Sequence, residues 1–475
     1  MATSAATAAG AYAVKNRDKD PYTYQVGFGN GFASEAIPGT LPIGQNSPQK
    51  VKYDLYAEGI NGTPFTTPRN DNQRTWFYRI RPSVSHDGFK KAFERNEYLE
   101  AEFSLKNPKQ HVTPTQLTWR PIEVPKDEKL NFFESIKTIM GNGGPMQREG
   151  LAIHVYAANK SMDKTAFVNS DGDYLIVPVE GRLDIQTELG KLMVRPGEIA
   201  VMQRGIKWKV VLPDGSARGY IQEIFGSHYE LPELGPLGAN GLANVRDFEH
   251  PVASFDIDQS PWEIVYKLGG KLFVCSQDHT PFDVVAWHGN YVPYKYDTEA
   301  FIIVGSISKD HLDPSIFTVL TARSKTPGAA LADFAIFKGR WDVATGTFRP
   351  PYFHRNTASE VLGLVMGEYG GRSEDFKPGG LSYETGFCPH GVDANVHKAA
   401  SEMDLVPMRV NEGCLMIMFE TSMMLTITDY AMNAPTRAEH VPGMWNALAP
   451  NFLKHTDQIN ADLKAAGLPP LGQGQ

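Results

Sequence analysis

Glycine and proline recur so often in this chain that few long regular elements fit between them. The 475 residues include 44 Gly and 33 Pro, and the short runs between them are rich in Val, Ile, Phe, Tyr and Thr, which favour strands. Five such runs follow one another closely, at residues 174–179, 183–187, 191–194, 199–202 and 208–212. Short strands that each end in a turn predict a mainly β chain built from jelly rolls or sandwiches.

Helical periodicity is confined to two segments. Within residues 127–140, apolar side chains recur at steps of three and four residues, at Leu130, Phe133, Ile136 and Met140. A second series lies near the C-terminus, at Met444, Leu448, Phe452, Leu453, Ile459 and Leu463. Each pattern predicts an amphipathic helix that packs against the β-structure.

Composition divides the chain into four parts. Residues 1–20 are small and polar, and they predict a loose N-terminal tail. We expect an N-terminal domain over 21–269 that ends in an ordered connector, because residues 231–255 have little strand character. A C-terminal domain is expected over 270–440, followed by a helix and tail over 441–475.

Glycines in the first β-rich region are spaced like the turns of hairpins. Gly172, Gly181 and Gly190 precede a Pro-Gly corner at 196–197, and this spacing resembles the small jelly-roll barrel of the cupins. A cupin that binds metal usually places two His and a Glu on these strands, whereas residues 172–212 contain no His. We therefore expect a metal-free, structural barrel here in preference to a hidden site.

Charge and hydropathy exclude several classes of partner. The 46 Lys and Arg against 54 Asp and Glu give a net charge of -8, and the chain has no long basic run that would bind nucleic acid. No segment approaches the roughly 18 apolar residues of a membrane helix, and residues 1–20 lack the apolar core of a secretory signal. The cysteines Cys275, Cys388 and Cys414 are too few for a disulfide framework, so we expect a cytoplasmic protein.

Three residues in the C-terminal half form a candidate metal site. His354 and Glu360 precede His390, which lies in a Cys-Pro-His-Gly segment. On a strand the first two would lie about 20 Å apart, and on a helix they would point to different sides, so the chain must reverse between them. The polar residues 355–359 supply that turn, and the apolar run 361–366 predicts a strand directly after Glu360.

Two histidines and one carboxylate suit a metal that keeps open positions for other ligands. Ferrous iron commonly uses this set on one face. Zinc also accepts it, although a catalytic zinc site more often has the compact His-Glu-x-x-His spacing, which is absent here. On spacing alone, a metal site at His354, Glu360 and His390 is no better supported than three ordinary loop residues.

A further histidine, His288, directly follows the apolar run 284–287 and precedes a Gly-Asn pair. It therefore lies where a buried strand emerges, which suits an acid/base imidazole at the mouth of a pocket. A hydrogen-bonded core histidine is the simpler interpretation of the same pattern. For His279, which has aspartates nearby, we expect a local hydrogen-bonding role.

Several long segments resemble the homogentisate 1,2-dioxygenase family. They are GQNSPQ at 44–49, YDLYAE at 53–58, LDIQTELG at 183–190, LPELGP at 231–236, DHTPFD at 278–283, WHGNY at 287–291 and HRNT at 354–357. Strings of this length over most of a chain are highly specific.

The resemblance implies a cupin-type protein with a metal-free N-terminal barrel and a C-terminal barrel that holds Fe(II), assembled as trimers that pair into hexamers. It implies that His354, Glu360 and His390 are the iron ligands, that His288 is the acid/base residue, and that Tyr369 contacts the substrate. In such an enzyme O₂ opens the aromatic ring of homogentisate and gives maleylacetoacetate, a step of tyrosine and phenylalanine breakdown.

The sequence departs from the family pattern around the expected pocket. Glu384 stands where a histidine is usual, Ala358 and Val361 replace larger side chains, and Arg372 replaces a common lysine. Glu384 would repel an anionic carboxymethyl group, and Arg372 would compensate for that repulsion. We therefore expect four residues to line the substrate site, namely Tyr369, Arg372, Glu384 and the metal ligand His390.

These departures leave three hypotheses open. The first is ring cleavage of homogentisate. The second is the same chemistry on hydroquinone or another para-dihydroxylated phenol, as in a fungal paralogue with an altered pocket. The third is a non-catalytic cupin that only binds a ligand or partner. Gln45 either reaches the pocket of a neighbouring subunit, as the resemblance suggests, or satisfies a local turn.

Overall fold

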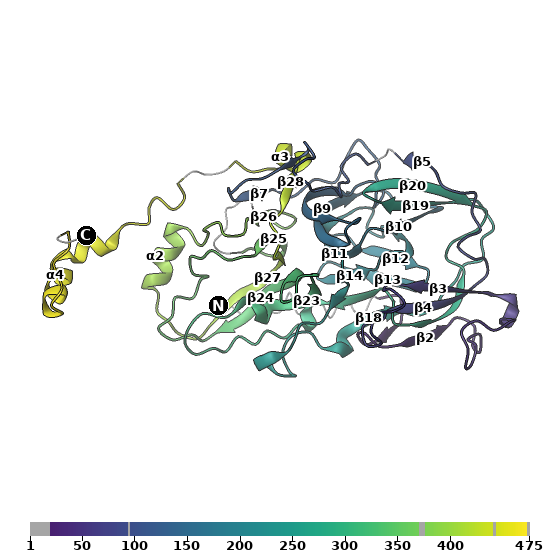
Figure 1. Ribbon diagram of the computed structural model, residues 1–475, viewed down its shortest axis with the longest axis horizontal. Coiled ribbons are helices and arrows are strands. Elements are labelled where there is room, and N and C mark those ends of the chain that lie inside the picture. The colour runs from purple at the N-terminus through teal and green to yellow at the C-terminus, as the bar shows by residue number, and fades with distance from the viewer. Residues whose placement is uncertain (1–19, 94–95, 370–375, 440–442, 473–475) are drawn as a thin grey trace.

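The structure, a computed structural model, describes residues 20–93, 96–369, 376–439 and 443–472. Most of its regular elements are strands, so the predicted mainly β class with few helices is confirmed. Of the predicted N-terminal tail, residues 1–19 lie outside the described residues. The strands form four sheets, and the three larger ones follow one another as layers along the body (Figure 1).

The middle layer is a ten-stranded sheet, called here the central sheet. In spatial order its strands are β1 (Tyr24–Val26), β18 (Phe248–Pro251), β22 (Tyr294–Asp297), β14 (Glu198–Met202), β11 (Asp173–Glu180), β16 (Ala217–Ile224), β9 (Glu149–Ala158), β8 (Lys137–Gly144), β28 (Thr426–Thr428) and β6 (Gln110–His111).

Two seven-stranded sheets flank the central sheet. The first outer sheet consists of β13 (Gly190–Val194), β12 (Leu183–Thr187), β15 (Lys207–Val211), β10 (Thr165–Asn169), β19 (Trp262–Leu268), β20 (Lys271–Gln277) and β5 (Lys90–Phe93). The second outer sheet consists of β17 (Tyr229–Glu230), β23 (Thr318–Arg323), β24 (Ala330–Asp342), β27 (Met408–Thr421), β25 (Ser359–Met366), β26 (Leu381–Glu384) and β7 (Leu117–Trp119). A small sheet contains β2 (Phe32–Glu35), β21 (Val284–Gly289), β4 (Arg74–Arg79) and β3 (Tyr56–Asn61).

The central sheet is buried on both faces. In β11, Leu175 and Val177 enter a core shared with the second outer sheet, whereas Tyr174 and Ile176 enter a core shared with the first. Successive side chains of a strand point to opposite faces, so a strand covered on both sides needs a continuous apolar run. Each large apolar side chain buried in this way contributes about 1.5–3 kcal/mol.

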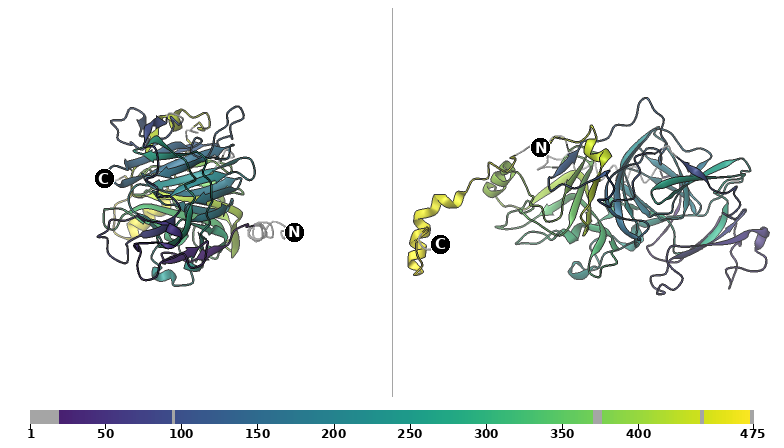
Figure 2. Two further views of the ribbon diagram at one scale, coloured as in Figure 1. Left: turned by 90° about the vertical axis from the view of Figure 1, so that its right-hand side faces the viewer. Right: turned by 45° about the horizontal axis from the view of Figure 1, so that its top comes forward.

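Helices are few and peripheral. The α-helices of the described residues are α2 (Ala394–Glu402), α3 (Asp429–Asn433) and α4 (Thr456–Ala465). Short 3-10 helices are η1 (Lys52–Asp54), η2 (Gly235–Leu237), η3 (Val245–Asp247), η4 (Thr298–Ala300), η5 (Pro314–Phe317) and η6 (Asn451–His455). Helix α4 lies within the predicted C-terminal helix, but it has no buried residue and projects away from the sheets (Figures 1 and 2).

The helix predicted over residues 127–140 is wrong. Residues 132–135 form a turn, and strand β8 begins at Lys137. Phe133 and Ile136 enter the core beside the first outer sheet, whereas Met140 enters the other core. The apolar spacing therefore reflects a buried turn followed by a strand with two covered faces, and packing overrides the short helical pattern.

The five strands predicted between residues 174 and 212 are confirmed as β11 to β15. The predicted division at 269/270 falls in the turn between β19 and β20. There Gly269 and Gly270 have φ of +61° and +72°, which a two-residue hairpin turn of this kind requires. Strands β20, β21 and β22 then pair with strands of the N-terminal half, so residues 271–297 continue the sheets of that half.

Two smaller expectations concern membrane helices and cysteine chemistry. Across the described ranges, no helix is long and apolar enough to span a bilayer. All three cysteines are unpaired, and Cys275 and Cys414 are buried.

Candidate metal centre

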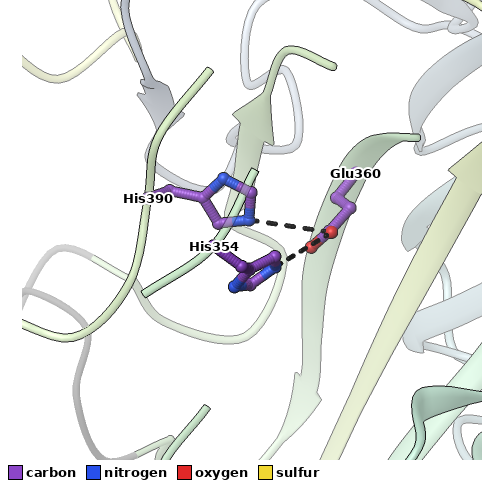
Figure 3. A group of neighbouring side chains, drawn as sticks. All are labelled: His354, Glu360 and His390. Atoms are coloured by element: carbon purple, nitrogen blue, oxygen red, sulfur yellow. Dashed lines mark ion pairs between the residues drawn. The ribbon is translucent and has the colours of Figure 1, made fainter. Parts of the chain in front are cut away.

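Three side chains from separate segments of the C-terminal half meet beside the second outer sheet (Figure 3). His354 lies in the loop before β25, Glu360 is the second residue of β25, and His390 lies in the loop after β26. One ligand atom from each lies within 4.8 Å of the others. The predicted strand after Glu360 is confirmed, and the chain reverses between His354 and Glu360 as the spacing required.

The loops that carry the two histidines are joined by their backbones. His354 and His390 form an isolated antiparallel bridge, in which each N–H donates to the carbonyl oxygen of the other over 3.1 Å. The Phe387 N–H donates to the Asn356 carbonyl oxygen, and the Gly386 N–H donates to Ser359 Oγ at the start of β25. These hydrogen bonds between the two loops hold His390 beside β25, although His390 lies several residues after the end of β26.

Each imidazole is oriented by a bond to its own loop. His354 Nδ1 contacts the Tyr352 carbonyl oxygen at 2.8 Å, and His390 Nδ1 contacts the Cys388 carbonyl oxygen at 2.9 Å. A carbonyl oxygen only accepts, so both Nδ1 atoms carry the proton and both Nε2 atoms are presented to the centre. Each Nε2 lies 3.7 Å from the same oxygen, Glu360 Oε1 (Figure 3).

The carboxyl group and the imidazoles shift one another's titration. Burial would raise the pKa of Glu360, but the neighbouring imidazoles of His354 and His390 and the hydrogen bond from Asn356 hold it below its ordinary value. The neighbouring Glu360 carboxylate raises the pKa of His354. Burial lowers the pKa of His390, yet the nearby Glu360 carboxylate and the hydrogen bond to a backbone carbonyl outweigh burial and raise it to about 9. The site thus attracts positive charge.

The arrangement fits a metal ion. Donors bound at about 2.0–2.2 Å cannot lie more than roughly 4.4 Å apart, and the 3.7 Å from each Nε2 to Oε1 is within that limit. The buried Nε2 of His390 has no hydrogen-bond partner among the described residues. A buried polar atom without a partner calls for an explanation, and a bound cation supplies one. Two nitrogens and one carboxylate oxygen form the set that leaves a face open for other ligands.

Carboxyl groups form a row with Glu360 across the second outer sheet. Glu384 of β26 and Glu420 of β27 are the register partners of Glu360 on its two sides, and Asp333 of β24 is the partner of Glu420. Directly paired residues point to the same face of a sheet. Burial, followed by repulsion from Glu360 and Asp333, raises the pKa of Glu420 to about 7. This row adds negative potential beside the centre.

Comparison with known proteins identifies the family. A model of the homogentisate 1,2-dioxygenase N-terminal domain matches residues 23–298, and a model of its C-terminal domain matches residues 299–452. The chain belongs to the homogentisate 1,2-dioxygenase family. The homogentisate 1,2-dioxygenase of Emericella nidulans is 48% identical over 441 residues, which cover 91% of this chain and 97% of the relative. That of Homo sapiens is 46% identical over 447 residues, covering 90% and 99%, and that of Caenorhabditis elegans is 50% identical over 415 residues, covering 87% and 94%.

Glu384, an expected departure from the family pattern, is the direct strand partner of Glu360. Its side chain is almost fully buried, with 3% of the residue exposed, and its charge acts on His390. Gln116 Nε2 donates to Glu384 Oε1 at 2.6 Å. Ala358 is also buried, but Val361 faces the core on the opposite side of β25 from Glu360, so the smaller side chain there affects packing and not the open face.

Of the other residues expected at the substrate site, Tyr369 lies in the described part of the chain. Tyr369 packs against the small core on the open face of the second outer sheet, which includes Leu362 and Leu364. It follows the end of β25, whereas Glu360 is the second residue of that strand. Arg372 lies outside the described residues.

His288 lies on β21 of the small sheet, with its Nε2 3.3 Å from the Tyr78 hydroxyl. That hydroxyl donates to the Asn46 carbonyl oxygen, so His288 lies near the exposed Gln45. The small sheet is at the opposite end of the body from β25 and β27 (Figures 1 and 2). Within one chain, the described residues do not bring His288 to the metal centre. His279 bonds the Asp278 carboxylate, the predicted local role.

Two residues of the centre were missed by sequence reasoning. Asn356 was interpreted only as a turn former, although its Nδ2 donates to Glu360 Oε1 at 2.8 Å. Glu420 has no local signal, because only the pairing of β25 with β27 places it opposite Glu360. An amide between two candidate ligands was the available signal for Asn356.

Proposed function

We propose that this protein opens the aromatic ring of homogentisate with O₂, giving maleylacetoacetate, and that His354, Glu360 and His390 hold the Fe(II) that this reaction uses. One observation carries the proposal. A centre of two histidines and one carboxylate lies in a chain that the two homogentisate 1,2-dioxygenase models match from residue 23 to residue 452.

The ligand set supports iron. Fe(II) held on one face by three protein groups supplies open positions for an aromatic hydroxyl and for O₂. The residues contribute orientation, since each histidine is fixed through Nδ1 and offers Nε2. Glu360 is ionised, because its pKa lies below the ordinary value. The row of carboxyl groups next to Glu360 lowers the cost of placing a dication there.

His288 is proposed as the acid/base residue of a centre in a neighbouring copy of the chain, within a homotrimer or a hexamer of two trimers. The support is its position, because the small sheet lies far from β25 in the same chain (Figure 1). Burial lowers the pKa of His288, and the nearby Arg74 lowers it further. A neutral imidazole able to accept a proton is thus available at neutral pH. Gln45, next to this cluster, is proposed to reach the same partner site.

Tyr369, Arg372, Glu384 and His390 are proposed to line the substrate side of the centre. Glu384 also favours a second candidate, cleavage of hydroquinone or another para-dihydroxylated phenol without an anionic side chain. The observation behind it is a buried carboxyl group one strand away from Glu360, where an anionic substrate group meets repulsion.

The unpaired cysteines support a reducing, cytoplasmic location.

Oxygen uptake tests the proposal. The protein is loaded with Fe(II) under nitrogen and mixed with homogentisate or hydroquinone, and O₂ consumption is followed together with the ultraviolet absorbance of the ring-opened product. We expect homogentisate to be consumed with one O₂ per molecule. Faster turnover of hydroquinone would support the second candidate. A lack of O₂ uptake with both substrates, in protein shown to hold iron, would favour a binding cupin without catalysis.

A further inference from the structure

Asn356 connects all three parts of the metal centre. It lies between His354 and Glu360 in the chain, and its carbonyl oxygen accepts a hydrogen bond from Phe387 N–H at 2.6 Å in the loop that carries His390. Its side-chain Nδ2 donates to Glu360 Oε1 at 2.8 Å. The oxygen that it contacts is the one that faces both His Nε2 atoms.

The orientation of this amide is fixed by chemistry. A carboxylate only accepts hydrogen bonds, so the group that faces Glu360 must be the amide NH₂ and not the amide oxygen. The other amide atom, Asn356 Oδ1, is buried and has no hydrogen-bond partner among the described residues. Leaving a buried acceptor unpaired is destabilising. The side chain therefore keeps its bond to Glu360 at the expense of its own oxygen.

We propose that Asn356 is a positioning residue for the metal centre, and that its Nδ2 fixes Oε1 of Glu360 as the oxygen presented to the ion. This inference rests on the proposed metal binding but not on ring cleavage. Glu360 also stands opposite the carboxyl groups of Glu384 and Glu420, whose charges disfavour an ionised neighbour. The donor amide counteracts that repulsion and restricts rotation of the carboxylate.

Metal affinity provides the test, with Co(II) as the probe and metal-free protein as the starting material. Asn356→Ala removes the donor, and Asn356→Leu removes it while keeping nearly the same volume. Mutation of a residue that hydrogen-bonds a metal ligand typically lowers metal affinity by about 10–100-fold. We expect Co(II) to bind both variants roughly 10–100-fold more weakly than the parent, and Asn356→Gln, which retains a donor amide, to recover part of the loss.

Thr357→Ala is the matched control, because Thr357 is the exposed neighbour in the same turn. We expect it to bind Co(II) as the parent does. The loops are joined through the backbone of Asn356, so the metal-free variants should keep the circular dichroism spectrum and unfolding temperature of the parent, while the rise in unfolding temperature on adding Co(II) becomes smaller.

Binding of Co(II) by Asn356→Ala and Asn356→Leu within about threefold of the parent would overturn the inference. A matching loss in Thr357→Ala would do the same, since it would indicate a general effect of the turn. A protein whose Co(II) affinity depends on Asn356, but which cleaves no substrate when loaded with Fe(II), would refute the proposed function and leave this inference standing.

Discussion

His354 and His390 are joined through their backbones independently of any metal, because each N–H donates to the other's carbonyl oxygen at 3.1 Å. Two ligands that lie far apart in the chain are thereby held as register partners. The bridge does not depend on either imidazole. The fold of the centre and its ability to bind metal can therefore be separated by mutation.

Substitution His354→Ala should abolish metal binding and O₂ uptake while leaving the β-structure intact, because the bridge uses only backbone atoms. Metal content, O₂ consumption and far-ultraviolet circular dichroism check this together. His455→Ala, in the exposed segment η6, is the control and should behave as the parent does. Full metal content in His354→Ala would contradict the ligand assignment and support a binding cupin with another site.

Metal affinity should rise with pH. A histidine binds metal in its neutral form, and the pKa values of His354 and His390 are both raised, that of His390 to about 9. At neutral pH the metal ion must therefore displace protons from these imidazoles, and the imidazoles carry fewer protons as the pH approaches 9. Titration of metal-free protein with Co(II) between pH 6.5 and 9 should give increasing affinity and measurable proton release. A Co(II) affinity that is constant over this pH range would contradict the raised pKa values of the two histidines.

Substitution Glu384→Gln should change substrate preference. Removing a charge near the centre relieves repulsion of an anionic substrate by about 1 kcal/mol at an effective dielectric constant near 20 with partial screening. We expect kcat/KM for homogentisate relative to hydroquinone to rise by about 3–10-fold. The Gln116→Glu variant, which adds charge at the hydrogen-bond partner of Glu384, should move the ratio the other way. An unchanged ratio in both variants would place Glu384 outside the substrate site.

Substitution Glu420→Gln should stabilise the metal-free protein in a pH-dependent manner. The folded-state pKa is raised from 4.5 to about 7, so the unfolded chain loses this proton first as the pH rises. The stabilising difference should be absent below pH 4.5, grow between pH 4.5 and 7, and stay constant above pH 7. Denaturant unfolding at pH 4.5 and 8 measures it. Equal differences at both values would show that Glu420 has an ordinary pKa.

Mixing two inactive variants tests whether centres are shared between copies of the chain. His288→Ala alone and His354→Ala alone should each lose most activity. If His288 of one copy serves the centre of another, co-assembled His288→Ala and His354→Ala chains form some intact sites and recover part of the O₂ uptake. No recovery in assemblies shown by mass spectrometry to contain both chains would contradict the shared-site proposal.

Local sequence patterns predicted the β-rich half well. Residues 174–212 alternate turns with apolar runs, and every predicted strand there is present. The helix over 127–140 failed because four apolar residues at suitable steps cannot distinguish a helical face from residues that enter two different cores. Phe133, in the turn before β8, and Met140, in β8, enter the cores on opposite sides of the central sheet, and only the assembled layers determine this.

The metal centre was predictable in composition but not in geometry. The separation of His354 and Glu360 required a reversal of the chain, which the structure contains. Nothing local indicated that His390 pairs with His354, or that Glu384 and Glu420 flank Glu360. Those relationships follow from strand register, which depends on long-range pairing.

Strand β28 occupies an interior position of the central sheet, between β8 and β6, although it comes from residues 426–428. When a ribosome has reached residue 400, strand β28 has not yet been synthesised, so β8 and β6 lack the strand that lies between them in the folded central sheet. Pairing across such separations is slow and leaves apolar faces exposed in the meantime. The time of greatest risk for aggregation is therefore during synthesis, and a chain terminated early in this region should require chaperones.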